Sequence, residues 1–144
     1  VFCLYCTAFF LYISNAVIPI IYIYYNFPYL IYVASLSAFF CHVYPVWLRF
    51  KGGKGVATYV GILFTLNIYF GLIFITAWLI TFSVSKYSSL SSLIASISIP
   101  IYLLFLTEID QAIFFTIIFV LIFFNHRENI KRLRNKEETK KKIY

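Results

Sequence analysis

The chain has 144 residues, of which 62% are hydrophobic and 22% aromatic, but only 12% are charged. Because soluble domains usually carry about 25% charged residues, this composition excludes an ordinary soluble domain and predicts an integral membrane protein. The net charge of +7 comes mostly from a basic segment over residues 127–142, and no soluble module accompanies it, so we expect no nucleic-acid partner.

Apolar runs follow one another over residues 1–25, 29–48, 59–84, 88–106 and 112–124. The breaks between them are a turn-like segment at 26–28, a polar decapeptide at 49–58, a serine-rich break at 85–89 and an acidic break at 107–111. Backbone groups in hydrocarbon must pair within their own segment, and the runs are too long and too uniformly apolar for a transmembrane barrel. The sequence therefore predicts an all-α, polytopic transmembrane helix bundle.

The distribution of Lys and Arg predicts the topology, because basic loops stay in the cytoplasm. The loop at 49–54, Lys86 and the C-terminal tail are basic, whereas the acidic break can lie outside. An even number of crossings must then separate the loop from the tail, which requires residues 56–84 to form two short helices that turn near Asn67 and Gly71. The alternative is one helix over 59–84, which would leave the tail outside.

This arrangement gives about six crossings. Residues 1–126 would form the transmembrane domain, with a cytoplasmic motif loop at 49–58, and residues 127–144 a basic cytoplasmic tail that can contact lipid headgroups. The chain contains no Met and starts inside an apolar run, so we expect an N-terminal portion to be missing.

No metal site is expected. Cys3, Cys6 and Cys41 lie inside apolar runs, where cysteine usually behaves as a small packing residue. The chain has two histidines, His42 and His126, and neither shows a zinc-binding spacing. We expect no cofactor either.

The decapeptide RFKGGKGVAT combines cations with glycines. Three glycines would let backbone N–H groups approach a ligand closely, Lys51 and Lys54 would neutralise an anion, and a helix starting at Val56 would add its N-terminal partial charge. A Walker loop is excluded, because Gly follows each Lys. The pattern favours a phosphate site; the alternative is a flexible basic loop.

Two further polar positions border the apolar runs. His42 lies at the inner end of a crossing, where a structural role is the commoner one. On a helix, His126, Asn129 and Ile130 would share a face. A histidine can take a proton near neutral pH, and Asn129 could orient a hydroxyl or a carbonyl. The alternative is an ordinary basic juxtamembrane helix.

The stretches HVYPVWLRFKGGKGVAT, KYSSLSSLIA and HRENIKRL resemble, in order and spacing, motifs of the bacterial acyl-phosphate:glycerol-3-phosphate acyltransferase family. The resemblance covers residues 42–133. It implies a seven-helix enzyme of the bacterial inner membrane with a cytoplasmic C-terminus. Such an enzyme transfers a fatty acyl group from acyl phosphate to glycerol 3-phosphate, which gives lysophosphatidic acid and phosphate.

The resemblance also implies roles for individual residues. His126 and Asn129 would be catalytic, and Glu128 would support the structure. Substrate binding would involve Lys51, Gly52, Gly53, Lys54, Gly55, Thr58 and His42.

The chain departs from the family pattern at some positions. The family's first motif, S-x-N-x-G-A-T-N-x-x-R, is absent, and Cys41 and Tyr44 replace the usual Gly and Phe. A second hypothesis is therefore a non-catalytic family member, or a transporter-like bundle with an anion-binding loop.

Overall fold

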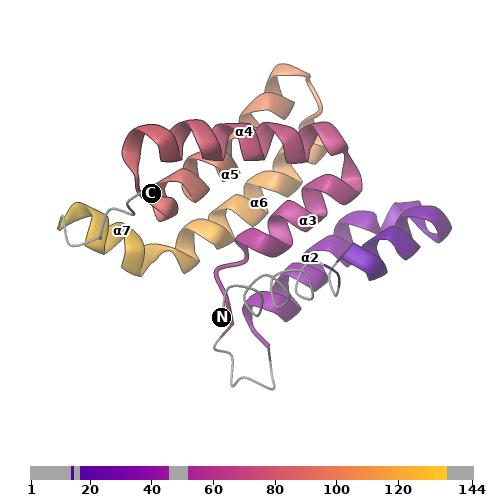
Figure 1. Ribbon diagram of the computed structural model, residues 1–144. Coiled ribbons are helices and arrows are strands. Elements are labelled where there is room, and N and C mark those ends of the chain that lie inside the picture. Colours follow the sequence, from indigo (N-terminus) through magenta and orange to yellow (C-terminus); the bar gives the residue numbers. More distant parts are fainter. Residues whose placement is uncertain (1–13, 15–16, 46–51, 136–144) are drawn as a thin grey trace. The chain divides into compact units, whose positions relative to one another are not determined.

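The computed structural model describes residue 14 and residues 17–45 and 52–135, and the regular structure in these residues is helical (Figure 1). The elements are a helix Val17–Asn26, η1 (Pro28–Leu30), α2 (Ile31–Val43), α3 (Val56–Leu66), α4 (Ile68–Ser85), α5 (Ser88–Phe105), α6 (Ile109–Asn125) and α7 (Arg127–Arg134). The predicted all-α class is confirmed for the described residues. The chain forms two compact units, Val1–Gly71 and Leu72–Tyr144.

Two of the described helices, α4 and α5, are long and apolar enough to cross a membrane, and α6 with α7 makes a third if this bent pair is one span. The helices Val17–Asn26, Pro28–Val43 and Val56–Leu66 are apolar but shorter. These apolar helices agree with the predicted integral membrane protein, whereas the number of six crossings stays a prediction.

The stretch 56–84 is two helices, as the topology required, and the single-helix alternative is wrong. Asn67 ends α3, since its N–H donates to the Leu63 carbonyl at 2.9 Å, and its backbone is extended. Its side-chain Oδ1 then accepts from the N–H of Tyr69 at 2.9 Å, near the start of α4. Gly71 permits the tight turn, because a Cβ there would lie 2.6 Å from the Phe64 ring. One asparagine therefore closes one helix and caps the next.

In the second unit, α5 and α6 pack side by side (Figure 1). A short connection, in which Thr107 has a positive φ of 62°, joins them. Small and aliphatic side chains of α5 are buried, among them Ala95, Ser96 and Ile99, and α6 buries Phe115 and Ile118. Small residues allow helix backbones to approach closely, as is usual in membrane proteins.

Hydroxyl groups within the apolar helices donate to the carbonyl three or four residues earlier. The residues that do so are Thr65, Thr76, Thr81, Ser91, Ser92, Ser96, Ser98 and Thr116. This pattern satisfies each hydroxyl within its own helix, and Ser92 also accepts a hydrogen bond from the Trp78 Nε1–H of α4 at 3.2 Å. It explains how a serine-rich helix such as α5 can lie in an apolar environment.

Candidate functional site

The end of α2 provides one wall of the predicted anion site. Ile31, Ser35, Phe39 and Val43 recur every four residues and form the buried face of this helix. The helix ends at Val43 with Tyr44 as its C-cap, because Pro45 disfavours helical geometry in the residue before it. His42 lies in the last turn and is partly exposed.

The three glycines of the loop have different surroundings. A Cβ on Gly52 would collide with the carbonyl oxygens of His42 and Val43, so this glycine lets the loop return against the end of α2. Gly55 has a φ of +84°, and its Cβ would lie 2.5 Å from the Phe39 ring. Around Gly53, by contrast, a Cβ would meet nothing within 4 Å. Two glycines are therefore needed for packing, and of the three only Gly53 has open space where a side chain would lie.

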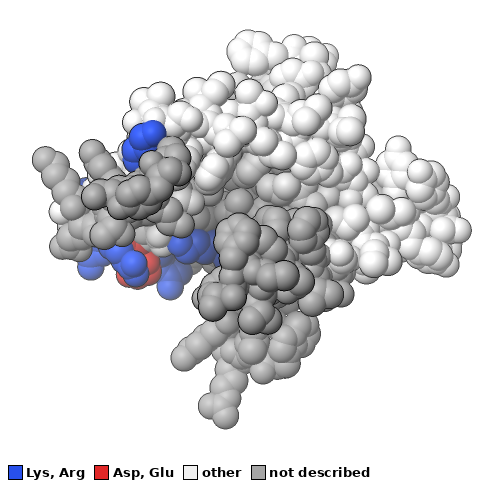
Figure 2. All heavy atoms as spheres, viewed as in Figure 1, with Lys and Arg blue, Asp and Glu red and all other residues white. Residues whose placement is uncertain are grey.

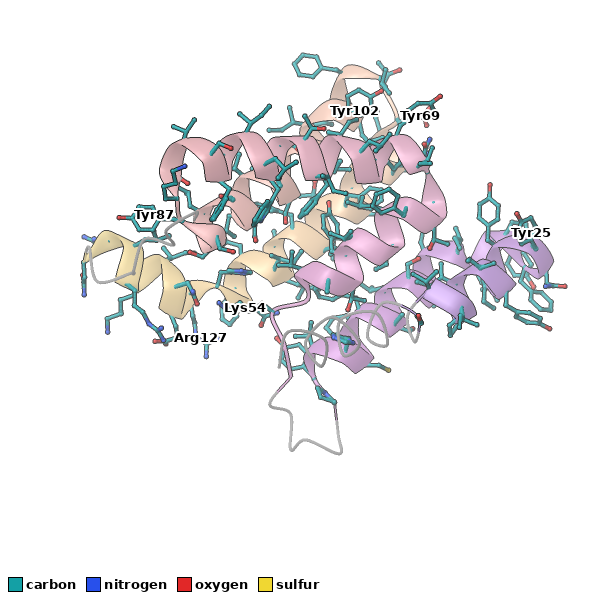
Figure 3. All side chains as sticks on the ribbon, in the orientation of Figure 1. Tyr25, Lys54, Tyr69, Tyr87, Tyr102 and Arg127 are labelled. Atoms are coloured by element: carbon teal, nitrogen blue, oxygen red, sulfur yellow. The ribbon has the colours of Figure 1, made fainter. Side chains whose placement is uncertain are left out.

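The helix α3 begins directly after this loop, with Gly55 as its N-cap. The first intrahelical bond runs from the N–H of Tyr59 to the Gly55 carbonyl at 2.9 Å, and no acidic residue lies in the first turn. The N–H groups of the first turn and the helix dipole therefore favour an anion. Lys54, labelled in Figure 3, is exposed at the start of α3 and adds a positive charge. The other predicted lysine, Lys51, lies outside the described residues.

Thr58 lies in the first turn of α3, and its side chain is fully buried. Its hydroxyl has no hydrogen-bond partner in the structure, and the same is true of the buried Ser35 hydroxyl on α2. A buried hydroxyl without a partner costs about 1–3 kcal/mol. The family resemblance implies that Thr58 binds substrate, whereas no pattern in the sequence points to Ser35.

In the second unit, His126 marks the bend between α6 and α7. It ends α6 and starts α7, and the two helix axes differ in direction by 60°. Its side chain is 2% exposed, and Nδ1 lies 2.8 Å from the Ile122 carbonyl oxygen. Because a carbonyl only accepts, Nδ1 must carry a proton, so in the neutral ring Nε2 carries the lone pair. This arrangement fixes both the ring orientation and the tautomer.

Asn129 and Glu128 lie on different sides of α7. Asn129 and Ile130 are partly buried and lie on the same face of the helix as the buried His126. Glu128, by contrast, is exposed. Glu128 is in the first turn of α7, where a carboxylate interacts favourably with the helix dipole. Figure 2 shows Lys and Arg side chains gathered over α7. The predicted common face of His126, Asn129 and Ile130 agrees with their burial.

The predicted residues thus fall into two groups, each within one unit. The first unit holds His42, the loop glycines, Lys54 and Thr58, and the second holds His126, Glu128 and Asn129. The described residues thus combine apolar helices, a basic glycine loop at the start of α3 in the first unit and an oriented histidine at the bend between α6 and α7 in the second unit.

Comparison with known proteins identifies the family. The family model for glycerol-3-phosphate acyltransferase matches residues 4–136. A glycerol-3-phosphate acyltransferase of Pelagibacter ubique is 62% identical over 132 residues, which are 92% of this chain and 69% of that protein. One from Rhodopseudomonas palustris is 47% identical over 108 residues, which are 75% of this chain and 53% of that protein. The chain belongs to the glycerol-3-phosphate acyltransferase family.

Solved structures agree with this assignment. The chain is similar to PlsY (YgiH), an integral membrane glycerol 3-phosphate acyltransferase, in its lysophosphatidic acid form, with a TM-score of 0.84 and 34% identity over 94% of this chain and 71% of that chain. The glycerol 3-phosphate form gives a TM-score of 0.86 and 33% identity, over 95% and 70% of the two chains. The family resemblance predicted from the three motifs is confirmed.

Proposed function

We propose that this protein transfers a fatty acyl group from acyl phosphate to glycerol 3-phosphate, which forms lysophosphatidic acid and inorganic phosphate. The observation that carries the proposal is the basic glycine loop at the start of α3, with open space around Gly53 and no acidic residue in the first helical turn. Phospholipid synthesis is the process in which such a product is used.

The loop would bind the phosphate of glycerol 3-phosphate. Backbone N–H groups at Gly52, Gly53 and Gly55, together with the first turn of α3, can donate to phosphate oxygens. Lys51 and Lys54 would neutralise its charge, and the buried Thr58 hydroxyl and His42 would complete the binding residues. Phosphate recognition by such a loop needs no metal and no cofactor.

His126 and Asn129 would act on the attacking hydroxyl. In the reaction, the glycerol hydroxyl oxygen attacks the acyl carbonyl carbon, the bond from this carbon to the phosphate oxygen breaks, and phosphate leaves with the electron pair. The hydroxyl proton must pass to a base, and the Nε2 lone pair of a neutral His126 is suited to this role because Nδ1 is held by Ile122. Asn129 would orient the hydroxyl or the carbonyl, and Glu128 would stabilise α7.

Acyl phosphate is a reactive acyl donor, so no covalent enzyme intermediate is needed. The apolar helices supply an environment for its acyl chain. We propose six crossings within this chain, an inner-membrane location in a bacterium and a cytoplasmic C-terminus, in line with the basic charge of the motif loop and of the tail.

The test is phosphate release by the purified full-length protein in lipid discs. Release is expected only when both acyl phosphate and glycerol 3-phosphate are present, and acyl-CoA should not replace acyl phosphate. Lys54→Ala should raise the KM for glycerol 3-phosphate, whereas His126→Ala should lower kcat by about 10²- to 10⁴-fold. Full activity in both variants would overturn the residue roles, and equal use of acyl-CoA would overturn the donor.

The second candidate is a non-catalytic protein with an anion-binding loop, including a transporter-like bundle. It is favoured by Cys41 and Tyr44, which replace the Gly and Phe that the family pattern has beside the motif histidine. The same assay separates the two functions, because a binding protein would retain glycerol 3-phosphate without releasing phosphate from the acyl donor.

A further inference from the structure

One exposed stripe runs along α6 and continues along α7. On α6 it consists of Ile113, Ile117, Val120 and Phe124, whose side chains are between 48% and 62% exposed. Their spacing of four, three and four residues keeps them on one face of the helix. An uninterrupted, exposed apolar stripe on a membrane helix is suited to contact lipid acyl chains, which are as apolar as these side chains.

Beyond Phe124 the same spacing continues, but the chemistry changes. The next positions, at intervals of three, four and three residues, are Arg127, Lys131 and Arg134, and all three are exposed. The guanidinium carbon of Arg127 lies 5.2 Å from the centre of the Phe124 ring, a cation–π contact that joins the apolar part of the stripe to its basic part. We call Arg127, Lys131 and Arg134 the basic stripe.

The 60° bend at His126 lies where the stripe changes from apolar to basic. If α6 stands across the bilayer, α7 must tilt strongly toward the membrane plane, with its cations next to the last lipid-facing ring. This is the level of the phospholipid headgroups, where Lys and Arg side chains are attracted to anionic lipids. An adjacent face of α7 carries Asn129, Ile130 and Leu133, which are partly buried.

We propose that the basic stripe is a binding surface for the headgroups of anionic phospholipids, and that these lipids hold α7 against the membrane. The occupant follows from charge and position: three cations continue a lipid-facing surface at the point where the acyl chains end. The proposal concerns lipid binding and does not depend on the chemistry proposed for His126 and Asn129.

Hydrogen exchange of the α7 backbone amides tests this inference. The full-length protein would be placed in discs of phosphatidylcholine alone, or of phosphatidylcholine with 30% phosphatidylglycerol (roughly the charge density of an anionic bilayer). We expect exchange over residues 128–134 to slow about tenfold or more in the anionic discs, and high salt to remove the difference. The triple variant Arg127→Gln, Lys131→Gln, Arg134→Gln should exchange at the same rate in both discs.

Arg132→Gln is the matched control, because Arg132 is an exposed cation on the same helix but lies outside the stripe. In the Arg132→Gln variant, anionic discs should still slow amide exchange of α7 nearly as much as in the wild type. In the Lys131→Gln variant, which changes the neighbouring residue, this slowing should be clearly smaller. Equal exchange of the wild type in both discs would overturn the proposal. So would equal losses in Arg132→Gln and Lys131→Gln, because α7 would then respond to its total charge rather than to one face.

Discussion

At the residue scale, the loop glycines show that one residue type serves two purposes within four positions. Gly52 and Gly55 lie where a side chain would collide with the end of α2, and Gly55 also needs a positive φ. Gly53 has neither constraint. The motif therefore combines packing glycines with one glycine whose surroundings are open, and substitutions can separate the two.

We predict that Gly53→Ala folds like the wild type but raises the KM for glycerol 3-phosphate, because the new methyl group enters the space proposed for the phosphate. Gly55→Ala should instead lower the thermal stability, since alanine at positive φ costs roughly 1 kcal/mol or more, and its Cβ would overlap with Phe39. Thermal unfolding in detergent and steady-state kinetics would measure the two effects.

The comparison provides its own control, because both variants add the same methyl group to the same loop. A Gly53→Ala protein with unchanged KM would show that the open space is not used by the substrate. Equal loss of stability in the two variants would contradict the difference in their surroundings.

At the element scale, the apolar stretch 56–84 is divided by a single polar side chain. Asn67 closes α3 with its backbone and caps α4 with its side chain. The predicted even number of crossings between the motif loop and the basic tail requires such a break. The asparagine inside this apolar run therefore marks the turn between two helices and does not lie within one long helix.

We predict that Asn67→Ala lowers the free energy of unfolding by about 0.5–2 kcal/mol, because the Tyr69 N–H loses its side-chain acceptor. Asn67→Asp should keep most of the wild-type stability, since aspartate caps a helix as well as asparagine does. Unfolding midpoints of the purified variants would be compared.

Thr76→Ala serves as the control for this measurement. Thr76 is exposed on α4, and its hydroxyl bonds to the Leu72 carbonyl of its own helix. If Asn67→Ala lowers the free energy of unfolding no more than Thr76→Ala does, the capping role of Asn67 is contradicted.

At the scale of the whole molecule, the charges of the connections predict which side of the membrane each one occupies. We expect Lys86 and Asn135 on the cytoplasmic side and Thr107 outside, because the connection at Thr107 carries acidic but no basic residues. Single cysteines at these three positions, in a protein without its native cysteines, would be labelled in intact cells with an impermeant maleimide.

Only the cysteine at position 107 should react before the membrane is opened. Reaction at position 135 from outside would contradict the proposed orientation of the tail. Reaction of positions 86 and 107 from the same side would show that α5 does not cross the membrane.

Much of this protein could be predicted from its sequence, because apolar composition, charge placement and motif spacing are properties of the chain itself. They determined the all-α membrane class, the break near Asn67, the start of a helix at Val56 and the family. The common face of His126 and Asn129 also followed from helical periodicity.

Only the tertiary structure decided what each residue of the motifs contacts. It showed that Gly52 and Gly55 pack against α2 while Gly53 faces open space, that the Ser35 and Thr58 hydroxyls are buried without a partner, and that α7 turns by 60° at His126. The physical reason is that hydropathy and charge are read along the chain, whereas collisions, burial and hydrogen bonds depend on neighbours that folding brings together.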